Sequence, residues 1–251
     1  MPDEKLQREI LNATIRDVIA ALPEMGRLMV ATNAGGATHE RIGNVEAVVV
    51  DGAYAKLSGA CHDSQIDLAM VASVIADRTG KMRDKMMPKL EMQDRSGITL
   101  FSIHVLDGPD LFEQALARFG DGKEVEPAVR APSEAGSQDI PSDDVGAVTF
   151  QAVLETGMPV TIEMRRAGLV QAWGGALPEP KPMMGFVNVM SKDFHLHLKA
   201  GAVTRWRKLG DAEEVELHAE GADGAITGLV LRGQASAFDK VPHVLDLAAH
   251  D

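Results

Sequence analysis

Two histidines and a lysine alternate with apolar residues in the stretch FHLHLK, residues 194–199. Such alternation predicts a β-strand, because successive side chains of a strand point to opposite faces. One face then carries the three apolar residues, and the other carries His195, His197 and Lys199. Neutral imidazole binds metal ions and lysine pairs with anions. The polar face is therefore interpreted either as a ligand site or as ordinary solvent-exposed surface.

A metal ion held by the two histidines alone would lack ligands. Zinc requires a third or fourth donor, and a cupin-like site would place a glutamate shortly after the histidines. The residues that follow, LKAGAVTRWRK, contain no acid and several cations, which oppose a divalent ion. A zinc-dependent enzyme built on His195 and His197 is one alternative, and it predicts metal in the purified protein.

The same cations suit haem. Ferric haem accepts a neutral imidazole as axial ligand, and its two propionates pair with lysine or arginine. His197 is the preferred axial ligand, with His195 as a second ligand or a hydrogen-bonding support. Lys199, Arg205 and Arg207 are the candidate propionate partners. The apolar residues expected to cover the macrocycle are Met183, Met184, Phe186 and Trp206.

Composition limits the classes of function. The chain has 251 residues and a net charge of −12, which disfavours binding to a nucleic-acid backbone. Its single cysteine, Cys61, excludes an intramolecular disulfide and fits a reducing compartment. The N-terminus is charged and amphipathic, unlike a signal peptide, and no apolar run reaches the roughly 20 residues of a membrane span. A soluble, cytoplasmic protein without stable membrane association is expected.

Apolar periodicity predicts helices over about 4–22, 107–120, 143–156 and 238–249, with β-strands between them. Residues 121–142 are rich in Pro, Gly, Ser and acid, which predicts a flexible linker. The domains are therefore expected at 1–120 and 143–251, on either side of that linker.

The two halves of the chain resemble one another at a spacing of roughly 128 residues. In this superposition Ile66 falls on Phe194 and Ala69 falls on His197. The predicted fold class is α+β, made of two repeated units, each an antiparallel β-sheet with flanking helices. Exposed sheet edges of this kind can pair into a homodimer.

The stretch GALPEPKPMMGFVNVMSKDFHLHLKAGAVTRW resembles the haem-utilisation proteins of the HemS and ChuX type. The matching motifs are the turn Gly175–Pro178, the Gly-aromatic-x-Asn strand Gly185–Asn188, and His197 on the following strand. The stretches ATHERIGNVEAVVVDG and IDLAMVASV resemble the N-terminal half of the longer, duplicated members more weakly. The resemblance implies a cytoplasmic, haem-binding protein of haem and iron utilisation. In some members of the family haem is also cleaved oxidatively.

The chain departs from that family at two places. Longer members supply an axial histidine from the segment between the halves, and here residues 121–142 contain none. The arginine that follows Ile-Asp-Leu in those members is replaced by Ala69. We therefore predict an intracellular haem carrier that exchanges its cargo with a haem-importing or haem-accepting protein, rather than an enzyme. The alternatives are a haem-degrading oxygenase-like protein and a non-catalytic interaction module that has lost the ligand.

The remaining candidates have structural interpretations. His39 is expected in a solvated turn, and His104 in the packed or half-exposed part of a strand. His62 beside Cys61 lacks the second thiol of a redox site. Met86 and Met87 are expected to fill core gaps. The cations considered for a propionate, but expected in surface ion pairs, are Arg165 and Arg166.

Overall fold

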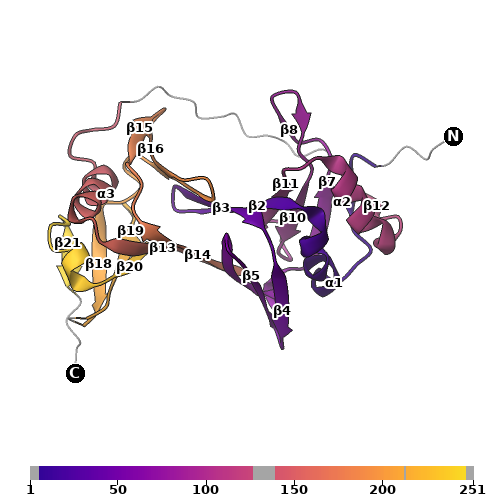
Figure 1. The fold of residues 1–251 in the computed structure, drawn as a ribbon, viewed down its shortest axis with the longest axis horizontal. Coiled ribbons are helices and arrows are strands. Elements are labelled where there is room, and N and C mark those ends of the chain that lie inside the picture. The colour runs from indigo at the N-terminus through magenta and orange to yellow at the C-terminus, as the bar shows by residue number, and fades with distance from the viewer. Residues whose placement is uncertain (1–5, 127–138, 212, 247–251) are drawn as a thin grey trace. The chain divides into compact units, whose positions relative to one another are not determined.

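The structure, a computed structural model, describes residues 6–126, 139–211 and 213–246. It contains two compact units. Unit 1 comprises Met1–Thr32, Arg41–Pro132 and Ala167–Val170, and unit 2 comprises Asn33–Glu40, Ser133–Arg166 and Gln171–Asp251. Each unit therefore includes a short segment from the other half of the sequence. Figure 1 follows the chain through its elements.

Unit 1 is built on antiparallel strands in the order β12-β1-β7-β10-β11-β2. Their bounds are Lys123–Glu124, Arg8–Ile10, Ser73–Asp77, Lys89–Gln93, Thr99–Val105 and Arg27–Ala34. A second set comprises β4 (Ala47–Asp51), β5 (Tyr54–Gly59) and β6 (His62–Asp67), joined in sequence order. The remaining elements are α1 (Ile15–Ala20), η1 (Leu22–Met25), η2 (Leu68–Met70), the hairpin β8 (Lys81–Met82) and β9 (Lys85–Met86), α2 (Pro109–Leu116) and η3 (Ala117–Phe119).

Unit 2 repeats this arrangement. One set of strands has the order β21-β18-β19-β20-β13, with bounds Val244–Asp246, Arg205–Gly210, Val215–Glu220, Ile226–Gly233 and Pro159–Arg166. The other set has the order β3-β17-β16-β15, with bounds Ala37–Asn44, Phe194–Lys199, Phe186–Met190 and Lys181–Met183. Helix α3 (Val145–Thr156) begins at the Asp144 cap and ends at Gly157, and η4 spans Ala235–Ala237. Strand β14 (Leu169–Ala176), like β3, contributes residues to both units.

The internal duplication is confirmed, with an offset of 132 residues. Strand β2 begins at Arg27 and β13 at Pro159, 132 residues later, and β3 and β14 are related in the same way. The cross-strand pair Lys56↔Gln65 of unit 1 corresponds to Asn188↔His197 of unit 2 at this offset. The residue equivalent to His197 is therefore Gln65 and not Ala69, which lies in η2. The predicted α+β fold of two repeated antiparallel units is correct.

Three predicted segments differ from the structure. The helix predicted over 4–22 is a strand at Arg8–Ile10 followed by a short helix at Ile15–Ala20, because β1 pairs with β7 and Thr14 caps the helix late. Within the predicted linker, Lys123–Glu124 pair with β1, and residues 127–138 lie outside the described part. The last predicted helix is replaced by η4 and β21, and residues 247–251 are not described. No helix of the described residues is long and apolar enough to cross a membrane.

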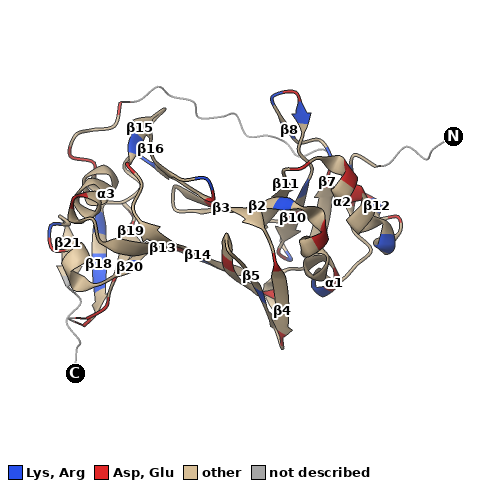
Figure 2. Cartoon of the chain, viewed as in Figure 1, with Lys and Arg blue, Asp and Glu red and all other residues tan. Residues whose placement is uncertain are grey.

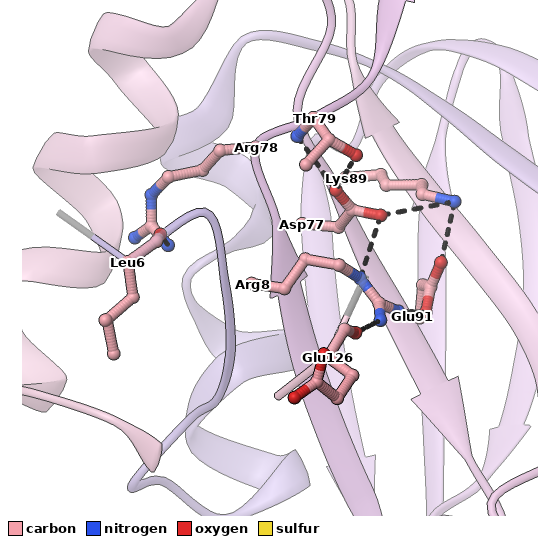
Figure 3. Close-up of polar contacts among 8 residues, drawn as sticks. All are labelled: Leu6, Arg8, Asp77, Arg78, Thr79, Lys89, Glu91 and Glu126. Carbon is pink, nitrogen blue, oxygen red and sulfur yellow. Dashed lines mark hydrogen bonds and ion pairs between the residues drawn. The ribbon is translucent and has the colours of Figure 1, made fainter. Parts of the chain in front are cut away.

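A buried cluster of charges joins three strands of unit 1 (Figure 3). Arg8 of β1 donates to the Asp77 carboxylate of β7 at 3.2 Å and to Glu91 of β10 at 2.6 Å. Lys89 pairs with Glu91 at 2.6 Å. Burial raises the pKa of Asp77, but hydrogen bonds from Thr79 and the charges of Lys89 and Arg8 outweigh it, so the pKa lies below its usual value. Because each buried charge has a partner, these polar residues are compatible with the interior of the unit.

Replacing Arg8 tests this cluster. In Arg8→Ala, Asp77 and Glu91 keep their buried charges but lose the guanidinium between them, so we expect a loss of about 3–5 kcal/mol in the free energy of unfolding. The matched control is Lys56→Ala, which removes an exposed pair with Asp63 and should cost about 1 kcal/mol or less. Urea denaturation at pH 7 measures both. Equal losses in the two variants would contradict the structural role of the buried cluster.

Candidate functional site

Strand β17 presents two histidines on one face, as the sequence predicts. Phe194, Leu196 and Leu198 are fully buried in the core of unit 2, whereas His195 and His197 on the opposite face are about one-third exposed. The Phe194 ring stacks on the indole of Trp173, with the ring centroids 4.8 Å apart. Packing of the apolar face therefore fixes the side on which both imidazoles emerge.

The neighbouring strand β16 fixes the orientation and tautomer of His197. Asn188 lies directly opposite it in the ladder, and Asn188 Oδ1 is 2.6 Å from His197 Nδ1. The Asn188 amide nitrogen faces three backbone carbonyls, those of Lys181, Met183 and Phe186. An amide nitrogen can only donate, so the oxygen must be the atom that faces the histidine. His197 Nδ1–H therefore donates to Asn188, and in the neutral ring Nε2 carries a lone pair.

A carboxylate from a distant part of the sequence completes the cluster. Glu40 of β3 places Oε2 at 3.1 Å from His195 Nδ1 and at 3.9 Å from His197 Nε2. One ligand atom from each of the three residues lies within 4.8 Å of the others. All three residues belong to unit 2. Sequence reasoning missed Glu40 because it interpreted residues 35–44 as a turn. The repeat offset identifies them as a strand, since they correspond to the segment that includes β14.

The environment of His197 favours the neutral imidazole. Burial lowers its pKa below 6.5, the Glu40 charge raises it in part, and His195 lowers it further. A neutral ring at neutral pH is the form that can coordinate a metal centre. The site therefore offers one imidazole with a defined tautomer and an available lone pair, beside a second imidazole and a carboxylate.

The predicted propionate partners are placed differently from one another. Lys199 lies at the exposed end of β17, on the face that carries both histidines. Arg205 and Arg207 lie on β18, in the other strand set of unit 2, and both guanidinium groups pair with Glu220 (Figure 2). Their basic groups are therefore already engaged by an acid. The structure thus brings Lys199, but not the two arginines, to the strand of the histidines.

The apolar residues expected to cover a ligand also separate into two groups. Met183 and Met184 are well exposed in the turn between β15 and β16. Trp206, in contrast, is fully buried, and its indole N–H donates to Thr149 Oγ1 at 2.8 Å. Trp206 is therefore a core residue, and its expected contact with a ligand is wrong.

His39 is a buried structural residue and not a solvated loop histidine, so that expectation is wrong. It has no solvent exposure, its Nε2 is 3.2 Å from the Ile162 carbonyl oxygen, and Gln171 Nε2 is 3.0 Å from its Nδ1. His39 and Gln171 are equivalent positions of the duplication. His62 is also buried, and its Nε2 is 3.0 Å from the Gly43 carbonyl. His104 is half-buried in β11, as expected.

Comparison with known proteins follows from this architecture. The fold defines a class of duplicated, antiparallel α+β proteins. The crystal structure of ChuS, described as an E. coli heme oxygenase, matches with a TM-score of 0.71 and 19% identity over 91% of this chain and 83% of that chain. The holo-PhuS structure, a heme-binding protein from Pseudomonas aeruginosa, matches with a TM-score of 0.71 and 18% identity over 90% and 81%. No curated protein sequence matches the chain.

Family membership is supported by the sequence itself. Residues 9–121 match the family model described as haem utilisation ChuX/HutX. The N-terminal half of the chain therefore belongs to the haem utilisation ChuX/HutX family, and the whole chain has the duplicated fold of ChuS and PhuS. The matched half is the one whose resemblance was judged the weaker from the sequence.

The tautomer of His197 can be tested directly. We expect the imidazole ¹⁵N spectrum of the unliganded protein to show His197 protonated on Nδ1 at neutral pH, because Asn188 accepts that proton. Asn188→Ala should remove this preference and shift the population toward the Nε2-protonated form. A spectrum identical in the variant and the parent protein would contradict the assigned hydrogen bond.

Arg165 has a structural role that gives a pH-dependent stability. Its guanidinium forms two bonds to Glu216, of 2.9 and 2.6 Å, and also pairs with Glu163. The Arg165 hydrogen bond is the main cause that lowers the pKa of Glu216 from 4.5 to about 2. Glu216 therefore stabilises the folded state above pH 4.5, and this contribution is lost as the pH falls from 4.5 toward 2.

The corresponding variant is Glu216→Gln. At pH 7 it should lose about 1–2 kcal/mol of unfolding free energy, a value reduced from the full pKa shift because both side chains are partly exposed. The difference between variant and parent should shrink as the pH is lowered from 5 to 3, as measured by urea denaturation at each pH. A difference that is independent of pH would exclude the ion pair as its source.

Proposed function

We propose that this protein binds haem through His197 and acts as a carrier in haem utilisation. The observation that carries the proposal is the Asn188–His197 hydrogen bond of 2.6 Å. It leaves Nε2 as the lone-pair atom, and the environment lowers the pKa of the ring. An axial ligand of haem iron needs both properties, and hydrogen bonding to the other ring nitrogen is the usual way to orient it.

The residues around His197 fit haem in part. Lys199 lies on the same face of β17 and offers a cation for a propionate, and Met183 and Met184 offer exposed apolar surface. Arg205 and Arg207 remain candidates only if a propionate displaces Glu220 from them. Haem bound here would supply an iron centre able to accept the His197 imidazole. The chain would supply the ligand, its orientation and the surrounding cation.

The family and the fold support the ligand class. Residues 9–121 match a haem utilisation family, and the structure of PhuS, which shares the fold, is described as that of a heme-binding protein. A carrier also requires a haem-importing or haem-accepting protein as partner. The proposed compartment is the cytoplasm, in keeping with the single cysteine.

A haemin titration tests the proposal. We expect a saturable change in the Soret band at about one haem per chain, because one oriented imidazole is available. His197→Ala should abolish or strongly alter the spectrum. His218→Ala, which removes a half-buried histidine of β19, serves as the matched control and should titrate like the parent protein.

Two results would reject this assignment. Saturable binding that is unchanged in His197→Ala would place the ligand elsewhere, and His195→Ala would then be tested. Binding no stronger than to a non-specific protein would reject haem as the ligand. Adding a reductant and oxygen to the complex separates carrier from oxygenase, since a carrier leaves the macrocycle intact whereas an oxygenase bleaches the Soret band.

A further inference from the structure

Three potential metal ligands from two strands converge on one carboxylate oxygen of unit 2. Glu40 Oε2 lies 3.1 Å from His195 Nδ1 and 3.9 Å from His197 Nε2, and the three ligand atoms are within 4.8 Å of one another. Donors on one face of a bound ion lie about 3 Å apart when each metal–ligand bond is about 2.1 Å. The unliganded side chains are therefore close to the arrangement that an ion would impose, and small rotations complete it.

The chemistry of the three donors indicates the kind of ion. Two neutral imidazoles and one carboxylate form a set that binds divalent first-row transition metals with positions left open for water or another ligand. Calcium and magnesium prefer oxygen ligands alone. The three side chains range from 15% to 32% exposed, so an ion has access from solvent.

The charges around the cluster are less unfavourable than the sequence indicates. The sequence places Arg205 and Arg207 close after the histidines, which opposes a divalent ion. In the structure both arginines belong to a different strand set of unit 2 and pair with Glu220. Glu40 also supplies the acid that the local sequence lacks. The two objections to a metal site therefore do not hold in the folded protein.

His197 is prepared for coordination by a second interaction. Asn188 holds the proton on Nδ1, so the lone pair lies on Nε2, the atom nearer to Glu40. A hydrogen bond to the non-coordinating nitrogen is the usual outer-shell partner of a histidine ligand. His195 would move its proton to Nε2 and give up its hydrogen bond to Glu40, and the ion would take the place of that proton.

We propose that Glu40, His195 and His197 form a binding site for a non-haem divalent transition-metal ion, with zinc as its test ion. The site holds one ion per chain. At the equivalent positions of the duplication, 132 residues away in the sequence, the chain has Ala172, Asp63 and Gln65. This second set lacks both imidazoles and the glutamate.

The ion and haem use the same atom. Both need the lone pair of His197 Nε2, so binding of one excludes the other. Glu40 distinguishes them, because a carboxylate is a ligand for the free ion but is not needed by an axial imidazole. The metal site does not rest on the haem proposal, and Glu40→Gln separates the two.

The experiment titrates metal-free, full-length protein with zinc by calorimetry, and with cobalt by visible absorption. We expect one ion per chain. Glu40→Gln keeps the size of the side chain and should weaken zinc binding at least about tenfold, since loss of even an outer-shell partner costs about 10–100-fold. His197→Ala should abolish binding. The matched control is Asp63→Asn in unit 1, which should bind zinc like the parent protein.

Each outcome decides the proposal. Zinc binding lost in Glu40→Gln while haemin binding persists would support two ligands with a shared histidine. Zinc binding lost in Glu40→Gln when the parent protein takes up no haemin would support the metal site and reject the haem carrier. Zinc binding unchanged in Glu40→Gln, or absent from the parent protein, would overturn the metal site. His195→Gln repeats the test if Glu40→Gln fails to give the thermal unfolding profile of the parent protein.

Discussion

The alternation of side chains along β17 is the constraint on which the candidate site depends. Phe194, Leu196 and Leu198 are buried in the core of unit 2, and Phe194 stacks against Trp173. A shift of one residue in register would bury two imidazoles and expose three large apolar side chains, at a cost of several kcal/mol. The apolar face therefore holds His195 and His197 on the open side of the strand. The rest of the site is arranged around that choice.

The neighbouring strands convert two exposed histidines into a defined chemical group. β16 supplies Asn188, whose amide is oriented by three backbone carbonyls and so accepts the Nδ1 proton of His197. β3 supplies Glu40, whose carboxylate lies beside both rings. One ring nitrogen thereby becomes the ligand atom and a negative charge lies within reach. The same atoms serve an axial haem ligand and a small divalent ion, and only the carboxylate separates the two uses.

The two units of the duplication use their polar residues in different ways. Unit 1 buries Arg8 with Asp77 and Glu91 between neighbouring strands, where the charges compensate one another and hold the sheet together. At the position equivalent to His197 it carries Gln65 on the solvent side of β6. Unit 2 keeps its imidazoles partly exposed. The common fold therefore tolerates a structural charge cluster in one copy and a ligand site in the other.

The sequence by itself determined the repeated α+β fold, most strands of unit 2, and the face on which His195 and His197 lie, because these follow from local alternation of apolar and polar residues. It did not determine that Arg8–Ile10 form a strand, because the pairing with β7 and the buried charges outweigh a helical apolar spacing. Nor did it reveal Glu40 as a neighbour of His195, 155 residues away. Only the tertiary structure decided which distant strands lie side by side. Strand pairing is a long-range interaction that residue spacing does not encode.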